Sequence, residues 1–297
     1  MGKWLRLRLW YPALARLPLP VGYALAAISG IGEILVDQGG RRAVAEGLRC
    51  LLPGLSLLRR AEILVRHFVM KSWECLDAFV LMVDARRAAS LVHVSGLEIL
   101  RQARSEGAGV ILVMAHFGRI NLHALGLARA GERLGMLTMA IDNNPDLDKV
   151  ERDYLRAKAA ALHRHLGGSW IRLGGSLRQL YRDLARGEVV VILLDAYVPG
   201  WEKRAVKLPF FGGRLALPTG ILRLAQRTGA RLVYAGALQK GFRVRGYLKP
   251  LPSEPEAGFQ AALCCLEQDI SRFPWLWWQW NLVPQIFAPA ESQVSTI

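Results

Sequence analysis

The chain has 297 residues, of which 52% are hydrophobic and 21% are charged, and its formal net charge is +15. This length holds one large α/β domain or two modest ones, with ample apolar residues for a core. A basic and apolar chain suits an anionic partner, such as a membrane surface or an acidic carrier protein. It contains no zinc-finger spacing, RNP-type aromatic strand or basic helix of the usual kinds, so we expect no nucleic-acid partner.

The four cysteines, Cys50, Cys75, Cys264 and Cys265, include no CxxC pair. In a chain of this length they do not resemble a disulfide framework, which indicates a reducing compartment. We expect them to act as small buried hydrophobic residues.

The N-terminal segment, residues 1–40, is predicted to be a helical, membrane-associating extension of an α/β domain that covers residues 41–297. Basic residues precede an apolar stretch, residues 17–36, that is just long enough to span a bilayer. The stretch contains Pro18, Pro20 and Glu33 and has no obvious cleavage site, which argues against a secretory signal. Three interpretations stay open: a membrane span, a helix in the interface, and a buried amphipathic helix of the domain.

The rest of the chain alternates helical patterns with short, continuous apolar runs. Such alternation is typical of an α/β fold, with a mostly parallel central sheet flanked by helices on both faces. We predict helices at 41–53, 56–83, 94–107, 143–168, 176–188, 217–230 and 257–273. The predicted strands are 108–117, 135–142, 189–197 and 231–238.

Two polar residues follow buried strands of this predicted sheet. His116 ends the strand at 108–117, and Asp195 ends the strand near 188–194. In parallel sheets, sites gather at the carboxyl ends of strands. Histidine is an effective general base at neutral pH, and no GxSxG motif supplies a protein nucleophile, so His116 would activate a substrate hydroxyl directly. The alternative is a structural histidine.

Several segments resemble a known family when taken together. They are "GVILVMAHFGRIN" (109–121), "IDNNPDLDKVERDYLRA" (141–157), residues 171–233 with their strand ending in Asp, PFFG block and TGxxxLAxxTGA helix, and "RRAVAEGLRCLLPGLS" (41–56). They are similar to the bacterial lipid A biosynthesis (lauroyl and myristoyl) acyltransferases, within the wider glycerolipid acyltransferases. The resemblance extends over residues 12–283.

The resemblance implies a mechanism and a location. His116 would deprotonate a hydroxyl or amine of a lipid or glycolipid acceptor, which attacks the thioester of acyl carrier protein or acyl-CoA. The thioester is the co-substrate, and no metal or other cofactor is expected. The enzyme would lie at the cytoplasmic face of a bacterial inner membrane, held by its N-terminal segment.

Asn121 stands where the family has the Asp or Glu of its H-x4-D/E motif. An amide can orient an imidazole, but it cannot balance the charge of an imidazolium. Asn121 is therefore the second predicted catalytic residue, in a slower or retuned site. A second hypothesis has another acid, Glu74, Asp142 or Asp195, reach His116. In the third, the chain is a catalytically impaired relative that binds lipid or carrier protein.

Asp195 is the third predicted catalytic residue, with a positioning role. It begins a "DAYVPG" segment where the family commonly has DQD. The alternative is that Asp195 caps a helix or forms a structural ion pair. We expect phosphates or phosphopantetheine to contact basic side chains, an acyl pocket to be lined by aromatic rings, and Thr219 to cap a helix near the site. The predicted substrate-binding residues are Gly118, Arg119, Arg156, Lys203, Arg204, Phe210, Phe211, Gly212 and Thr219.

Four tryptophans, Trp275, Trp277, Trp278 and Trp280, end the part of the chain that resembles the family. Amphipathic rings of this kind favour a membrane interface, and packing against the sheet is the alternative. The family usually ends in a WxWxHRRW-like segment, whose basic residues are absent here.

Overall fold

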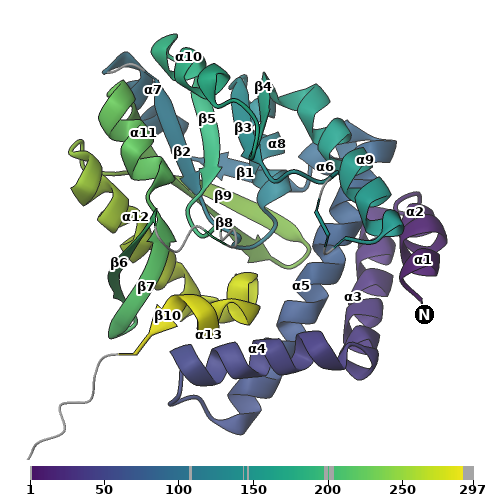
Figure 1. Cartoon of the computed structure of the whole chain (residues 1–297). Helices are drawn as coiled ribbons and strands as arrows, with labels where there is room; N and C mark the ends of the chain where they lie inside the picture. Colours follow the sequence, from purple (N-terminus) through teal and green to yellow (C-terminus); the bar gives the residue numbers. More distant parts are fainter. Residues whose placement is uncertain are drawn as a thin grey trace, which may run out of the picture.

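The computed structural model describes residues 2–106, 109–142, 144–145, 147–196, 200 and 204–289. Figure 1 shows an α/β fold built on a seven-stranded sheet of order β1-β9-β8-β2-β5-β3-β4. Neighbouring strands are parallel except for β8 and β9, which are antiparallel. The predicted fold class is confirmed. The strands are β1 (Val92–Ser95), β2 (Val110–Met114), β3 (Leu134–Thr138), β4 (Gly167–Arg172), β5 (Val189–Leu193), β8 (Arg231–Lys240) and β9 (Arg243–Pro250).

Helices cover both faces of this sheet (Figure 1). Strand β2 has apolar side chains on both of its faces. Its five residues are all buried, because alternate side chains enter two different cores. Ile111 and Val113 pack in one core, and Leu112 and Met114 pack in the other. The longer helices are α3 (Leu19–Val36), α4 (Gln38–Leu51), α5 (Leu57–Val83), α7 (Leu97–Ser105), α8 (Ile120–Arg129), α9 (Lys149–Leu166), α10 (Arg178–Ala185), α11 (Gly220–Thr228) and α12 (Pro255–Arg272).

The N-terminal segment is packed against the domain. It contains α1 (Lys3–Leu5), a π-helical turn (Arg6–Trp10), α2 (Tyr11–Leu14) and α3. Gly22, Tyr23, Ala26 and Gly30 of α3 are buried, and Tyr23 and Ala26 belong to one of the two cores. Tyr11 and Leu14 lie in the same core. The predicted boundary at residue 40 therefore does not separate two independent cores, and the extension as a distinct domain stays a prediction.

The outer side of α3 is apolar. Ile28 is 64% exposed and Leu35 is 75% exposed. Among the described residues, α3 is the one helix long and apolar enough to cross a membrane, a criterion that signal sequences and core helices also meet. One side of α3 therefore packs on α5, and the other side exposes apolar residues.

A second, three-stranded antiparallel sheet has the order β10-β7-β6. Its strands are β6 (Ala205–Phe210), β7 (Gly213–Pro218) and β10 (Phe287–Ala288). The β6–β7 turn consists of Phe211 at φ +46° and Gly212 at φ +71°, a pair that suits a two-residue hairpin. The sequence pattern predicts no strand here, because Pro209 and Pro218 interrupt it.

Three further strands escaped prediction: β1, β4 and β9. The edge strand β1 is short, with half-exposed and exposed positions in alternation. Along β9, charged residues alternate with buried ones, and β4 begins with two glycines. None of these forms the continuous apolar run that marks a strand covered on both faces.

The tail segment, residues 273–289, packs inside the molecule beside α4 (Figure 1). It contains two 3-10 turns (Pro274–Leu276 and Gln279–Asn281), α13 (Val283–Ile286) and β10. Trp275, Trp277 and Trp280 are buried, which supports packing and contradicts a membrane-interface role for them. Gly47 of α4 makes this approach possible, because a side-chain carbon there would collide with the Trp280 carbonyl.

Candidate active site

His116 and Asp195 meet where two central strands end. β2 and β5 pair in parallel up to Met114 and Leu193, and the Leu194 N–H then donates to the Met114 carbonyl at 2.7 Å. His116 and Asp195 follow the strands by two residues each, so the pairing places their side chains next to each other. The side chain of His116 is 32% exposed, whereas that of Asp195 is fully buried.

The Asp195 carboxylate holds His116 at two points. Its Oδ1 lies 2.9 Å from the imidazole Nδ1 and also accepts the backbone N–H of His116 at 2.9 Å. Its Oδ2 accepts the indole N–H of Trp277 at 2.8 Å. In the part of the chain that the structure describes, the hydrogen bonds of the imidazole are all at Nδ1, so Nε2 remains for a substrate.

The surroundings of Asp195 favour its ionised form. Burial by itself raises the pKa of this carboxyl, but the charge of His116 and the hydrogen bonds from His116 and Trp277 outweigh it. The net result is an Asp195 pKa below its ordinary value. A carboxylate at this position fixes the imidazole and stabilises an imidazolium if the ring takes up a proton.

The tail segment closes over the loop that follows His116. The Trp278 backbone N–H donates to the His116 carbonyl at 2.8 Å, and its indole N–H donates to the Gly118 carbonyl at 2.9 Å. The Gly118 N–H in turn donates to the Leu276 carbonyl at 2.6 Å. Gln279 places its amide nitrogen 2.8 Å from Nδ1 of His116. These tail residues were missed by sequence reasoning, and the tryptophan cluster was the signal for them.

Gly118 has a structural reason to be glycine. Its φ is +65°, a conformation that other residues rarely adopt, and an added side-chain carbon would collide with the carbonyl oxygen of Ala237. The residue therefore lets the loop after His116 pass close to β8. A role in substrate binding stays a prediction.

Asn121 lies in the first turn of α8, but its side-chain amide donates to Glu74 of α5. The same Glu74 oxygen accepts from Lys158 of α9 at 2.9 Å. Burial raises the pKa of Glu74, against the opposing charge of Lys158. The amide that replaces the family's acid thus belongs to a polar cluster between three helices, and the carboxylate on the imidazole is Asp195.

Arg119 was predicted to contact a substrate phosphate, but the structure buries it. Its guanidinium pairs with Asp77 of α5, at 2.7 Å for the Nε–Oδ2 contact, and donates to the Phe242 carbonyl at 2.7 Å. Tyr23 of α3 donates to the same carboxylate. With a hydrogen bond at each of its three nitrogens and almost no exposed surface, Arg119 connects the site loop to α3 and α5 and is not part of the substrate site proposed below.

The other predicted basic residues that the structure describes, Arg156 and Arg204, are exposed. Arg156 is exposed and pairs with Asp142, with 2.6 Å between Nε and Oδ1. Lys203 lies outside the described residues. Arg204 is exposed, and its carbonyl accepts both the backbone N–H and the hydroxyl of Thr219, at 3.2 and 3.0 Å. Thr219 does occupy the N-cap position of α11, but its hydroxyl does not cap the helix, which corrects that prediction.

The predicted acyl-pocket residues pack behind the site. Phe210 is buried, with its ring centre 6.2 Å from that of Trp277, and it contacts Phe211 edge-on at 4.8 Å. The Phe211 N–H donates to Glu267 at 2.9 Å, and Gly212 completes the hairpin turn. The three residues therefore support Trp277 and the β6–β7 hairpin, and a direct contact with an acyl chain stays a prediction.

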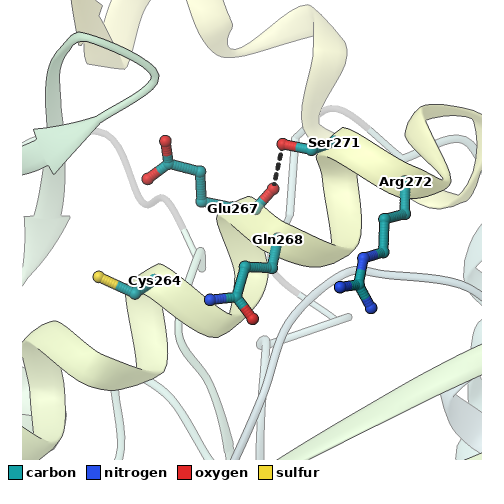
Figure 2. Close-up of a pocket in the computed structure, with 5 residues that line it drawn as sticks. All are labelled: Cys264, Glu267, Gln268, Ser271 and Arg272. Carbon is teal, nitrogen blue, oxygen red and sulfur yellow. Dashed lines mark hydrogen bonds between the residues drawn. The ribbon is translucent and has the colours of Figure 1, made fainter.

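Two surface grooves lie away from His116. Figure 2 shows one of about 390 Å³, whose lining comes from α12 alone: Cys264, Glu267, Gln268, Ser271 and Arg272. The other, of about 530 Å³, lies between α6 (Ala85–Ala89), α8 and the end of α9. None of the residues that hydrogen-bond to His116 lines either groove. The two grooves therefore do not form part of the His116 site.

The fold and the His116–Asp195 pair define a class, an α/β protein with a histidine held by a carboxylate at the carboxyl ends of its strands. A family model described as "Bacterial lipid A biosynthesis acyltransferase" matches residues 1–269. The chain belongs to this family of acyltransferases. It is also 27% identical over 226 residues to the Lipid A biosynthesis lauroyltransferase of Escherichia coli (strain K12), which covers 74% of this chain and 68% of that protein.

Proposed function

We propose that this chain transfers a fatty acyl group from a thioester to a hydroxyl or amine of a lipid or glycolipid acceptor, with His116 as the general base. The observation that carries the proposal is the 2.9 Å contact between Nδ1 of His116 and Oδ1 of Asp195. It leaves Nε2 without a hydrogen-bond partner among the described residues, on a side chain that is 32% exposed. Asp195 then performs the role that the family gives to the acid at the position of Asn121.

The reaction has two stages. Nε2 of His116 takes the proton of the acceptor O–H or N–H as the acceptor atom forms a bond to the thioester carbonyl carbon. The tetrahedral oxyanion then collapses, the C–S bond breaks, and the departing thiolate takes the proton from Nε2. Asp195 stabilises the imidazolium between these stages and keeps Nδ1 protonated throughout. No protein nucleophile and no cofactor beyond the thioester enter the scheme.

The donor we propose is an acyl carrier protein, with acyl-CoA as the alternative. The net charge of +15 supports an acidic donor, since opposite charges accelerate encounter. The acceptor is a lipid or glycolipid of lipid A biosynthesis, in line with the family and with the name of the Escherichia coli relative.

We place the protein at the cytoplasmic face of a bacterial inner membrane. The exposed apolar side of α3, with Ile28 and Leu35, supports contact with the acyl region of one leaflet, while the opposite side of the helix stays packed on α5. This arrangement favours a helix in the interface over a span that is surrounded by lipid. The expected readout is binding to liposomes, which Ile28→Glu weakens and Leu177→Glu, at the N-cap of α10, does not.

The decisive assay uses purified protein, an acyl carrier thioester and a lipid A precursor, with His116→Ala as the comparison. We expect product from the wild type and a rate at least about 10³-fold lower from the variant. Equal rates would contradict the general-base role. Absence of product from both proteins, together with retained binding of thioester or lipid, would instead support a catalytically impaired binding protein, which the asparagine at position 121 favours.

A further inference from the structure

Two groups compete for one nitrogen of His116. Nδ1 lies 2.9 Å from Oδ1 of Asp195 and 2.8 Å from the amide nitrogen of Gln279. An ionised carboxylate only accepts hydrogen bonds, and an amide nitrogen only donates them. A ring nitrogen carries either a proton or a lone pair, so it cannot satisfy both neighbours at once.

The amide of Gln279 is fixed by a second contact. Its nitrogen also donates to the backbone carbonyl of Asp195 at 3.2 Å. If the amide were turned around, its oxygen would face this carbonyl, and two oxygens that only accept cannot form a hydrogen bond. One amide hydrogen therefore serves Asp195, and the other points at Nδ1. The tail segment holds Gln279 in place, since the neighbouring Trp278 N–H is bonded to the His116 carbonyl.

We propose that Gln279 is a positioning residue that sets the tautomer of His116 by competing with Asp195 for Nδ1. This inference rests on the proposed function. When Gln279 donates to Nδ1, the ring proton resides on Nε2, and that nitrogen cannot accept a proton from the acceptor. When Asp195 accepts from the Nδ1–H group, Nε2 carries the lone pair and the base is ready. Gln279 thus restrains the base, and Asp195 activates it.

The test is the ¹⁵N spectrum of the His116 ring, which distinguishes the two tautomers without any substrate, recorded near pH 9, where an ordinary histidine is neutral. Gln279→Leu removes the competing donor, so we expect the ratio of tautomers to shift about 3- to 10-fold toward Nδ1–H, the worth of one hydrogen bond. Gln279→Met serves the same purpose if the leucine variant does not fold. Gln285→Leu, in the same tail, is the matched control and leaves the ring signals unchanged.

Ring signals in Gln279→Leu and Gln279→Met that match the wild type, or that move toward Nε2–H, would overturn the proposal. Acyl transfer by the same variants provides the second readout, and we expect kcat to rise in proportion to the fraction of His116 in the Nδ1–H form that the spectra give. A tautomer shift without this rise would contradict the general-base role of His116, while a rise without the shift would contradict the role of Gln279. The two failures are therefore distinguishable.

Discussion

The indole N–H of Trp277 donates to Oδ2 of Asp195 at 2.8 Å, although 82 positions separate the two residues in the chain. Asp195 follows a central strand, and Trp277 comes from the tail segment that packs beside α4. Both side chains are buried. The His116–Asp195 pair is thus held in part by the tail segment, which binds the carboxylate through the oxygen that does not contact the imidazole.

Trp277→Phe removes this hydrogen bond and keeps an aromatic ring against Phe210 and Trp280. A hydrogen bond to a charged group contributes about 1.5–3 kcal/mol, so we expect acyl transfer to fall by roughly 10- to 100-fold. Steady-state kinetics provide the measurement. Trp275→Phe is the control, because the Trp275 indole nitrogen has no hydrogen-bond partner among the described residues. Equal losses in both variants would contradict a specific role for Trp277.

Asn121→Glu restores the residue type that the family has at this position, yet we expect it to impair the protein. The new carboxylate would face Glu74, whose pKa burial already raises, and two like charges would share a buried site. The predicted loss of stability is about 1–3 kcal/mol, with no gain in acyl transfer. Urea unfolding and kinetics measure both effects. Glu74→Gln in the same chain should restore stability, and an increased rate in the single variant would contradict this account.

The buried pair of Arg119 and Asp77 is predicted to stabilise the fold. Asp77→Asn leaves a buried guanidinium without its charge partner, and such a loss costs about 3–5 kcal/mol of unfolding free energy. The double variant Arg119→Met, Asp77→Leu should lose less than the single one, because no unpaired charge remains. If Arg119 instead served the substrate, Asp77→Asn would raise KM without lowering stability, and urea unfolding distinguishes the two.

His123 gives stability a pH dependence. Burial lowers the pKa of this histidine to about 4, and neither ring nitrogen has a hydrogen-bond partner among the described residues. Between pH 6.5 and about 4 the unfolded chain binds a proton that the folded chain refuses, so stability falls as the pH falls. We expect His123 alone to lower the free energy of unfolding by about 2 kcal/mol as the pH falls from 6.5 to 5.

His123→Leu should remove this loss of stability and leave the similar contribution of His67, whose pKa burial lowers to about 3, so that it continues to lower pH. At neutral pH the variant should be at least as stable as the wild type, because a buried ring without hydrogen bonds is replaced by an apolar side chain. Urea unfolding at pH 5 and pH 7 provides the test. An unchanged difference between these two pH values would show that His123 accepts a proton in the folded state.

The sequence predicted the fold class and the two strand ends that carry His116 and Asp195, because buried parallel strands appear as continuous apolar runs. It missed β1, β9 and the β6–β7 hairpin, in which polar and apolar residues alternate or prolines intervene. The position of α3 was left among three alternatives, since the apolar stretch gives no sign that Gly22, Tyr23, Ala26 and Gly30 would all pack on α5.

Within the site, the sequence placed Asp195 among three acids able to reach His116, and only the pairing of β2 with β5 decides for it. Arg119 illustrates the opposite outcome. A basic residue in a loop after a catalytic histidine resembles a phosphate ligand, but Asp77, 42 positions away, pairs with it in the interior. Gln279 and Trp277 were missed because contacts across more than 80 positions have no local pattern.

The most direct test of the account compares kcat for Asp195→Asn and Asn121→Ala in acyl transfer to a lipid A precursor. If Asp195 is the acid that holds His116, Asp195→Asn lowers kcat by about 10³- to 10⁴-fold, the scale seen when a catalytic histidine loses its carboxylate. Asn121→Ala then stays within roughly 10-fold of the wild type, since it loses one neutral hydrogen-bond partner. A greater loss in Asn121→Ala than in Asp195→Asn would contradict the assignment.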